Sequence, residues 1–454
     1  MKQEPGISVL QGGEDVNITL NSGQQAAVDV MTKELLSGDQ QGLTLLGEGG
    51  TGKTTCVMWA VEQWIKAGMS VIMAAPTNKA VKQLESSARR FGLNSTRVQF
   101  MTLHKALGLA MLPDEENMYA AQVAEPKLSD FDILVLDEGS MVSRIAFLQY
   151  LLPELESNKM KAVIMGDRMQ LPPVRESESM ALQHFPSIEL TKTERFSMDS
   201  DIAKVTTDLR MAMDSKKAFI FNSDDYPNLK TVKPAFFTKE VLENIDENTS
   251  QDDVRVLAWT NARVNMINKM IREKIYGRKA EPFIVGERVV TGRPITQGRD
   301  ILLSTDEECI VTGVDVASVM DENSGEEYKT YLITLQPLYD PVGSVVCHVV
   351  HPDSELTLFD DLEDLFRRAK RCTSADLRRQ LWAKYRYLRD LFSDLKYCYC
   401  ITVHRSQGST YQTVLVDVDN ILTNTRRDER RKLLYVALSR ASQNLITNKE
   451  RFAS

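Results

Sequence analysis

The run Gly47–Thr54, GEGGTGKT, has the residue types and spacing of a phosphate-binding loop. An apolar stretch at 43–46 leads into it and a helical pattern at 57–66 leads out. Its glycines let backbone N–H groups close around a β-phosphate, Lys53 reaches the β and γ oxygens, and the Thr54 hydroxyl can ligate Mg²⁺. The flanking pattern argues against a chance glycine-rich turn. We predict nucleotide contacts at Gly47, Gly49, Gly50, Thr51, Gly52, Lys53, Thr54 and Thr55.

An acidic pair ends a second apolar run and supplies the other half of this phosphate chemistry. In 131–138, FDILVLDE, Asp137 would hold Mg²⁺ together with Thr54, and Glu138 would orient the attacking water as general base. An isolated Asp-Glu pair often only opens a turn. The apolar run before it and the loop at 47–54 favour catalysis, with ATP and Mg²⁺ as the expected cofactors.

Three further elements could act on the same phosphates. Gln170, within 166–174, follows a third apolar strand and could contact the γ-phosphate. Arg440, in the late run 434–441, is a natural arginine finger from a second core, and Arg195 is a second candidate. The alternative for Arg440 is a surface salt bridge.

The elements that would position these residues form two sets. Strand-like runs end at Leu46, Ala75, Leu136 and Met165 and are mostly separated by helical stretches, which predicts an α/β core with a parallel sheet. A second α/β core is expected because the chain has 454 residues, more than one core usually holds. Its predicted strands are 254–259, 397–403, 413–416 and 444–447.

Two insertions interrupt these cores. In 291–396, the first part (309–350) is rich in β-branched residues, which predicts a small antiparallel sheet or barrel, and the rest is helical. A smaller insertion at 109–130 could hold a hairpin that turns at 113–117. We expect domain 1 at 1–205, domain 2 at 206–290 plus 397–454, and an accessory subdomain at 291–396.

Composition constrains the partners less than the motifs do. The net charge of −8 opposes a nucleic-acid partner overall, although Lys79, Lys82, Arg89, Arg90 and the run 367–371 are local basic sources. That run could equally be a solvated helix face. Six scattered cysteines favour neither zinc nor a disulfide framework. Without an apolar leader or spanning segment, a cytoplasmic protein is expected.

The ordered motifs from 20–25 to Arg440 resemble the superfamily 1 helicases, specifically the 5′-to-3′ branch that holds Dda-type and RecD-type enzymes. The resemblance implies two RecA-like domains and an ATP-driven motor that moves along single-stranded DNA and unwinds forks in replication, recombination or repair. It implies that Gln24 reads adenine, that Gly408 borders the nucleotide, and that 291–396 corresponds to SH3-like and tower elements. The hairpin region matches the family only in position. The DNA contacts implied are Pro76, Thr77, Lys79, Thr102, His104, Asn261, Thr402, His404 and Gln407.

Several alternatives stay open. A P-loop kinase or small-molecule ATPase would leave 407–408 and 435–440 without a task. A DNA-stimulated ATPase that displaces proteins without unwinding, and a motor subunit of a larger recombination complex, both remain. His104 and His404 could simply be buried, and Trp259 and Trp382 are more often core than base-stacking residues. A monomer could suffice, with single-strand-binding or recombination proteins as candidate partners.

Overall fold

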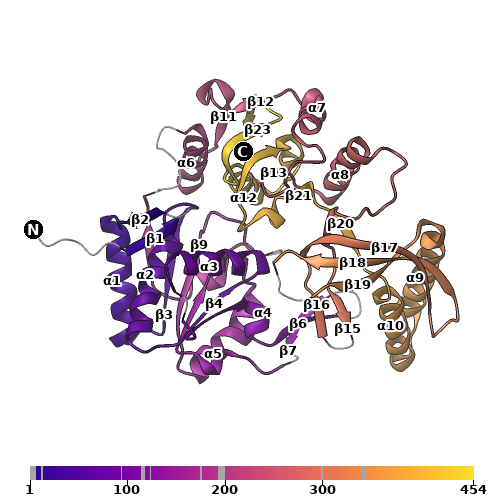
Figure 1. Ribbon diagram of the computed structural model, residues 1–454, viewed down its shortest axis with the longest axis horizontal. Helices are drawn as coiled ribbons and strands as arrows, with labels where there is room; N and C mark the ends of the chain where they lie inside the picture. The colour runs from indigo at the N-terminus through magenta and orange to yellow at the C-terminus, as the bar shows by residue number, and fades with distance from the viewer. Residues whose placement is uncertain are drawn as a thin grey trace, which may run out of the picture. The chain divides into compact units, whose positions relative to one another are not determined.

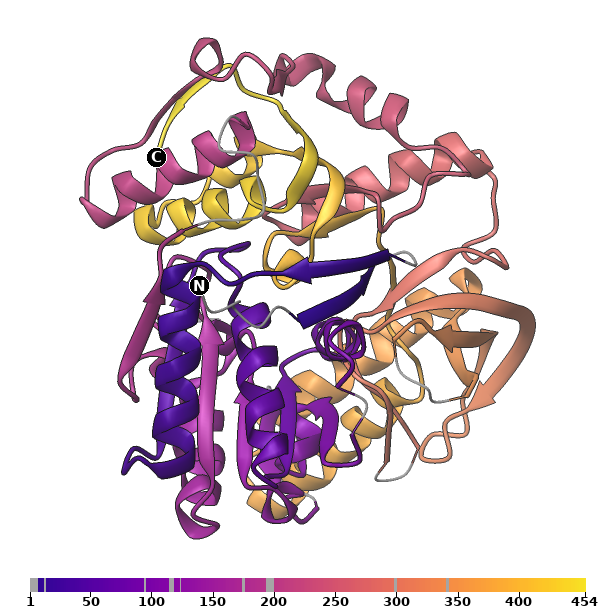
Figure 2. The same ribbon diagram turned by 60° about the vertical axis from the view of Figure 1, so that its left-hand side comes forward.

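Figures 1 and 2 show the computed structural model, which describes residues 7–11, 14–93, 95–113, 118–122, 124–173, 176–192, 200–297, 300–339 and 343–454. The chain forms two compact units. The first comprises residues 1–109, 122–271 and 399–454, and the second comprises 110–121 and 272–398. No helix in the described ranges is both long enough and apolar enough to cross a membrane.

The first unit contains a parallel sheet that carries the phosphate-binding loop. Within the described residues its strand order is β10-β3-β9-β8-β4-β5, and all pairs are parallel. The carboxyl ends of β3, β9 and β8 are therefore neighbours at one edge, where α/β sheets bind ligands. The four predicted strands are confirmed. The bounds are β3 (Gly42–Gly47), β4 (Val71–Ala75), β5 (Val98–Thr102), β8 (Ile133–Leu136), β9 (Lys161–Gly166) and β10 (Ser187–Leu190).

Helices cover both faces of this sheet, as Figure 1 shows. Leu43 and Leu45 pack into one core with the helices that precede and follow β3, whereas Leu46 and Leu136 pack into a second core on the opposite face. Burial on both faces explains why these strands read as continuous apolar runs. The helices are α1 (Ser22–Ser37), α2 (Lys53–Lys66), α3 (Asn78–Arg90), α4 (Leu103–Ala106), the π-helix η3 (Ala146–Leu151) and α5 (Leu152–Ser157).

A second parallel sheet in the same unit has the order β12-β23-β22-β13-β21 among the residues described. Two parallel sheets of this kind give the predicted pair of RecA-like folds. The strands are β12 (Lys230–Thr231), β13 (Val254–Ala258), β21 (Cys400–Thr402), β22 (Tyr411–Val416) and β23 (Ala441–Thr447). Its helices are α6 (Asp201–Asp214), α7 (Pro234–Asn244), α8 (Asn261–Tyr276), α11 (Val418–Leu422) and α12 (Arg427–Leu438).

The predicted single strand at 397–403 is wrong. Residues up to Tyr397 belong to β20 (Leu395–Tyr397) in an antiparallel sheet, whereas β21 joins the parallel one. Cys398 and Cys400 are both buried. Tyr399 and Ile401 are buried as well, so burial is continuous across the break although the ladder partner changes. Asn268 of α8 secures the second strand, donating to Cys400 O at 2.9 Å and accepting from Cys400 N at 2.7 Å.

The second unit is an antiparallel sheet followed by two helices, as predicted for the accessory region. Its described strands run β19-β18-β17-β14-β20, and β17 and β18 form a long hairpin. Trp382 is 2 % exposed and packs edge-on to Phe366 and Tyr385, so it is a core residue. The bounds are β14 (Arg288–Thr291), β15 (Ile295–Gln297), β16 (Asp300–Leu303), β17 (Glu308–Met320), β18 (Glu327–Pro337), β19 (Val345–Val350), α9 (Pro352–Arg371) and α10 (Ala375–Asp390).

Smaller hairpins complete the chain. The hairpin predicted in 109–130 is confirmed, because β6 (Leu109–Pro113) pairs with β7 (Met118–Gln122). Of its expected turn, residues 114–117 lie outside the described ranges. The other two-stranded sheets among the described residues pair β1 (Ile7–Gln11) with β2 (Glu14–Ile18), β11 (Ile220–Asn222) with β24 (Arg451–Ala453), and β15 with β16.

Candidate functional site

The phosphate-binding loop has the backbone that its glycines predict. Gly50 and Gly52 have φ of 90° and 85°, in the left-handed region, and α2 begins directly after them. Gln24 lies behind the loop, where its Nε2 donates to Thr51 O at 3.1 Å. A Cβ on Gly52 would lie 2.4 Å from that nitrogen. Glycine is therefore required at 52 by conformation, and a Cβ there would also displace the Gln24 amide.

Lys53 lies in the mouth of the loop. Its Nζ donates to Gly47 O at 2.7 Å and to Glu48 O at 2.8 Å. Thr54 and Thr55 are half-buried in the first turn of α2, where N–H groups and the helix dipole favour an anion. The loop thus presents an ammonium, a hydroxyl and backbone donors to one place.

The acidic pair occupies the end of β8. Glu138 has φ 50° and ψ 41°, a left-handed conformation that costs a non-glycine residue about 1–3 kcal/mol, and its N–H donates to Asp137 Oδ1 at 2.8 Å. Burial raises the pKa of both carboxyls. The pKa of Glu138 rises to about 7, chiefly through burial and Asp137, against the lowering effects of Arg440 and Lys53. A carboxylate with this pKa suits a general base near neutral pH.

Gly139, the residue directly after the acidic pair, has a packing reason to be glycine. A Cβ at this position would lie 2.5 Å from Ile164 Cγ2 and 3.1 Å from Leu182 Cδ2. The turn after the acidic pair therefore packs closely against β9.

Residues of the second sheet reach the same edge. Gly408 has φ 71°, and a Cβ there would lie 3.6 Å from Glu138 Oε1. Gln407 Nε2 donates to Leu171 O at 3.0 Å, and Tyr435 donates from its hydroxyl to Asp167 Oδ2 at 2.8 Å. The two late motifs thus contact the segments after β8 and β9.

Arg440 is buried, so the surface-salt-bridge alternative is wrong. The residue is 5 % exposed, and its guanidinium donates to Val436 O, Ser409 O and Ser439 Oγ, each at 3.1 Å. Its positive charge lowers the pKa of Glu138. A guanidinium held rigidly in this way is oriented before any ligand binds. Arg195 lies outside the described residues.

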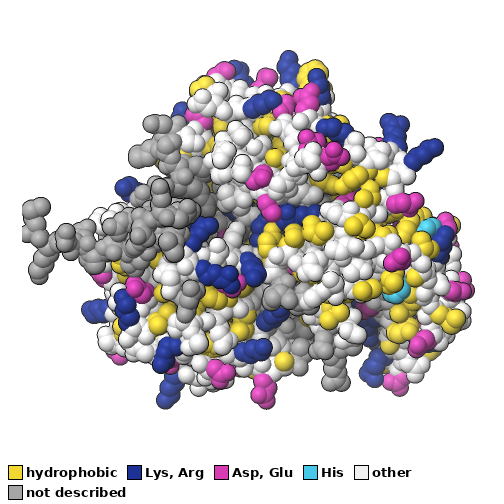
Figure 3. Space-filling model, in the orientation of Figure 1, with side chains coloured by type: hydrophobic (Ala, Val, Ile, Leu, Met, Phe, Trp, Pro, Cys, Tyr) yellow, Lys and Arg dark blue, Asp and Glu magenta, His cyan; other side chains and the backbone are white. Residues whose placement is uncertain are grey.

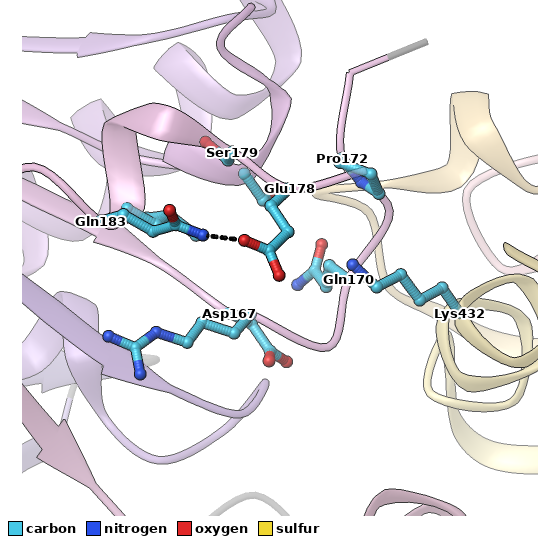
Figure 4. A pocket seen from close by; sticks show the side chains of 10 residues that line it. Asp167, Gln170, Pro172, Glu178, Ser179, Gln183 and Lys432 are labelled. Atoms are coloured by element: carbon cyan, nitrogen blue, oxygen red, sulfur yellow. Dashed lines mark hydrogen bonds between the residues drawn. The ribbon is translucent and has the colours of Figure 1, made fainter. Parts of the chain in front are cut away.

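Gln170 faces a small polar cavity of about 90 Å³ beside this edge (Figure 4). Gln170 is 5 % exposed, and within the described ranges its Oε1 has no hydrogen-bond partner. Lys432 enters from α12, and its Nζ donates to Ser177 O at 3.4 Å. The side chains labelled in Figure 4 are Asp167, Gln170, Pro172, Glu178, Ser179, Gln183 and Lys432.

A larger cavity of about 400 Å³ opens beside the loop. This volume is within the range of small-ligand sites. It is bounded by the loop, by α6 and by the α12 region. Its lining residues are Glu48, Gly49, Thr191, Lys192, Ala203, Lys204, Thr206, Thr207, Asp208, Tyr435 and Ser439.

Three threonines expected to contact DNA cap local turns. The hydroxyl oxygens of Thr77, Thr102 and Thr402 accept backbone N–H groups three residues on, at 3.2, 3.3 and 3.3 Å. Each keeps an O–H that can donate to a phosphate. Pro76 directly precedes the first of these caps, and Asn261 is exposed at the start of α8.

The histidines and lysine expected at the DNA differ in charge. His104 and His404 are half-buried, and burial lowers the pKa of each, so both are neutral at pH 7. Lys79 lies 4.0 Å from Asp252 and 5.1 Å above the Tyr411 ring. Figure 3 shows Lys and Arg side chains over the region that Figure 1 labels α3. Arg367 and Arg368 instead pair with Glu363 and Asp364 one turn earlier, as on a solvated helix face.

Sequence reasoning missed three residues at this edge. Tyr435 and Asp167 lie in motifs that were recognised, but their mutual hydrogen bond depends on two sheets meeting. Arg210 of α6 pairs with Glu48 of the loop, 162 positions away in sequence. One indication of these contacts was available in the sequence, which is the position of Tyr435 in an otherwise apolar run five residues before Arg440. Trp259, at the end of β13, is half-buried.

Comparison with known proteins gives matches in the same chain order. The family model described as AAA domain matches residues 19–225, and the one described as UvrD-like helicase C-terminal domain matches 397–446. An uncharacterized protein of Acanthamoeba polyphaga mimivirus is 22% identical, over 94% of this chain and 99% of its own length. The ATP-dependent DNA helicase dda of Enterobacteria phage T4 is 29% identical over 61% of this chain and 62% of dda.

A solved structure shares the fold. The Pif1 helicase from Bacteroides, crystallised with ADP-AlF3 and ssDNA, aligns with a TM-score of 0.51 at 18% identity, covering 95% of this chain and 93% of the other. The two matched models, the relatives and the shared fold agree with one another. These findings support the resemblance to the superfamily 1B helicases, and the solved structure supports the fold.

Proposed function

We propose that this chain is an ATP-dependent DNA helicase that moves 5′ to 3′ along single-stranded DNA and unwinds forks. The observation that carries the proposal is the meeting of Glu138 with Gly408 and Arg440 beside the phosphate-binding loop. Because the second core contributes Gly408 and Arg440 to the site that contains Glu138, hydrolysis can be coupled to motion between the two cores. A kinase has no need of such an arrangement.

In this proposal the loop holds the triphosphate. Backbone N–H groups of residues 49–55 bind the β-phosphate, and Lys53 exchanges its bonds to Gly47 O and Glu48 O for β and γ oxygens. Gln24 is proposed to read the adenine base, and to do so its amide would exchange the bond that its Nε2 donates to Thr51 O, or the bond that its Oε1 accepts from Asn21 N, for a bond to the base. The hydroxyl of Thr54 and the carboxylate of Asp137 are oxygen donors of the kind Mg²⁺ prefers. The ion would neutralise phosphate charge there.

Hydrolysis would then be carried out by the chain's own side chains. Glu138 accepts the proton of the attacking water, while Arg440 stabilises charge on the transferring phosphoryl group. Gln170 offers an unused Oε1 and its amide N–H₂ to the water or the γ-phosphate. Arg195 is a second arginine for the same charge. The two cores would close on ATP and reopen after hydrolysis.

The strand grip is proposed to be largely phosphate contact. Hydroxyl donors at Thr77, Thr102 and Thr402, with Pro76, Lys79 and Asn261, would bind the sugar-phosphate chain without reading sequence. His104, His404 and Gln407 would add neutral polar contacts. We further propose the division into domain 1 (1–205), domain 2 (206–290 plus 397–454) and the insert (291–396), with the β6–β7 hairpin meeting the duplex.

A strand-displacement assay tests this function. Matched duplexes carry one 5′ tail or one 3′ tail of the same sequence, and the protein is supplied with ATP and Mg²⁺. The expected result is unwinding from the 5′ tail alone, at a rate that falls as salt rises because phosphate contacts release counterions. DNA-stimulated ATPase without strand displacement would instead support a translocase that does not unwind.

A further inference from the structure

Beside the phosphate-binding loop, one arginine contacts three carboxylates. Arg210 of α6 bonds the Glu48 carboxylate through Nη1 and Glu189 Oε1 through Nη2 at 3.1 Å, and its Nε lies 3.7 Å from Asp214 Oδ2. The side chains of Arg210 and Glu48 are 15% and 13% exposed, whereas those of Glu189 and Asp214 are 50% and 54% exposed. Glu48 is therefore the shielded partner.

The position of Glu48 is electrostatically unfavourable for a carboxylate, because the loop is proposed to bind an anion. It is the second residue of the loop, its carbonyl accepts Lys53 Nζ at 2.8 Å, and it lines the 400 Å³ cavity. The cavity that Glu48 lines is beside the loop, so its carboxylate is near the place proposed for the anionic triphosphate. Left unpaired and shielded from water, it would repel that anion and would itself be costly to bury.

Arg210 reaches Glu48 from an element that follows the loop by 162 positions. Helix α6 packs against α12, which also carries Tyr435. Tyr435 bonds Asp167, and both lie close enough to Arg210 to interact electrostatically with it. The positive charge that neutralises Glu48 is therefore carried by α6. This helix packs against α12, whose Tyr435 bonds Asp167 beside the nucleotide site.

We propose that Arg210 is a positioning residue that cancels the charge of Glu48 and so lets the loop accept a nucleoside triphosphate. Arg210 acts through Glu48 and does not touch phosphate. The inference rests on the proposed function of the loop as the ATP site. It makes triphosphate affinity depend on α6 being in place against the loop.

Equilibrium titration with a fluorescent ATP analogue tests the pair, with DNA-stimulated turnover measured in parallel. Arg210→Ala should weaken binding by on the order of tenfold or more, as expected when one partner of a shielded charge pair is removed. Its turnover at saturating ATP should change much less. The double variant Glu48→Gln with Arg210→Ala should recover affinity, because no unpaired charge remains.

Asp214→Asn is the matched control, since it removes an exposed carboxylate that contacts the same arginine. It should leave affinity unchanged. Arg210→Lys should keep part of the native affinity, because an ammonium still offsets Glu48. If Arg210→Ala fails to fold, the double variant decides, since neutralising both partners of a shielded pair is far less costly than stranding one.

Two results would overturn the inference. One is a double variant that binds ATP as weakly as Arg210→Ala, which would mean that the arginine contacts phosphate directly. The other is a folded Arg210→Ala that binds ATP as tightly as the native protein. A native protein that binds no ATP would instead refute the proposed function.

Discussion

Replacing Arg440 by alanine should nearly abolish ATP turnover while weakening the fold by a measurable amount. The side chain donates three hydrogen bonds, all at 3.1 Å, and is 5 % exposed. Hydrogen bonds from charged groups contribute about 1.5 kcal/mol or more each, so their loss should cost roughly 3–5 kcal/mol of unfolding free energy. An arginine finger contributes on the order of 10³ in kcat, which is about 4 kcal/mol of barrier.

The assay is steady-state ATP hydrolysis on saturating single-stranded DNA, run well below the unfolding temperature of each variant. ATP affinity should change far less than kcat, since the arginine acts on charge that develops during transfer. Arg440→Lys is the companion variant: it keeps a charge but loses the planar fork, so it should fold better and remain slow. A folded Arg440→Ala with kcat within a few-fold of native would show that the arginine is structural.

Four further predictions follow from the same edge and from the strand-contacting motifs. Lys53→Ala should abolish hydrolysis with an unchanged circular dichroism spectrum, and near-native turnover would remove the nucleotide-site assignment. Glu138→Gln should bind ATP and Mg²⁺ yet turn over slowly, so a collapse of affinity with normal turnover would place the base elsewhere. Because burial lowers the pKa of His404, the unfolded chain takes up its proton first, and stability should fall as pH drops through about 6.5; His404→Gln should flatten that fall in Tm between pH 8 and pH 5.5. Deleting 113–117 should impair unwinding while sparing DNA-stimulated hydrolysis, and equal loss of both would assign the hairpin to the motor itself.

The sequence predicted what local pattern determines. The loop at 47–54, the strands that end at Leu46 and Leu136, and the change from β-rich to helical character within 291–396 all follow from residue types at fixed spacing. Each motif carries its own turn chemistry, such as the positive φ of Gly52. Elements of this kind can be predicted because their physical cause is contiguous in the chain.

Features that depend on which elements meet could not be predicted. The strand at 397–403 divides because its two halves find different ladder partners, and a continuous buried run does not determine which strand is the partner. The Glu48–Arg210 pair and the Tyr435–Asp167 bond each join residues more than 150 positions apart. The buried position of Arg440 likewise involves the carbonyls of Val436, in the preceding helix α12, and of Ser409, which its motif alone does not reveal.

The side-chain amide of Asn268 bonds both backbone polar groups of Cys400, its carbonyl oxygen and its N–H, near the point where the chain returns to the first unit. Ile271, the last residue before the chain leaves that unit, lies three positions further along the same helix. One side chain therefore links the helix from which the 127-residue excursion 272–398 departs to the strand by which the chain returns. Asn268 and Cys400 both belong to the first unit, so this link does not itself use any residue of the excursion. Exchange of the whole excursion for an unrelated module is a route by which such motors could acquire new tasks without rebuilding their catalytic edge.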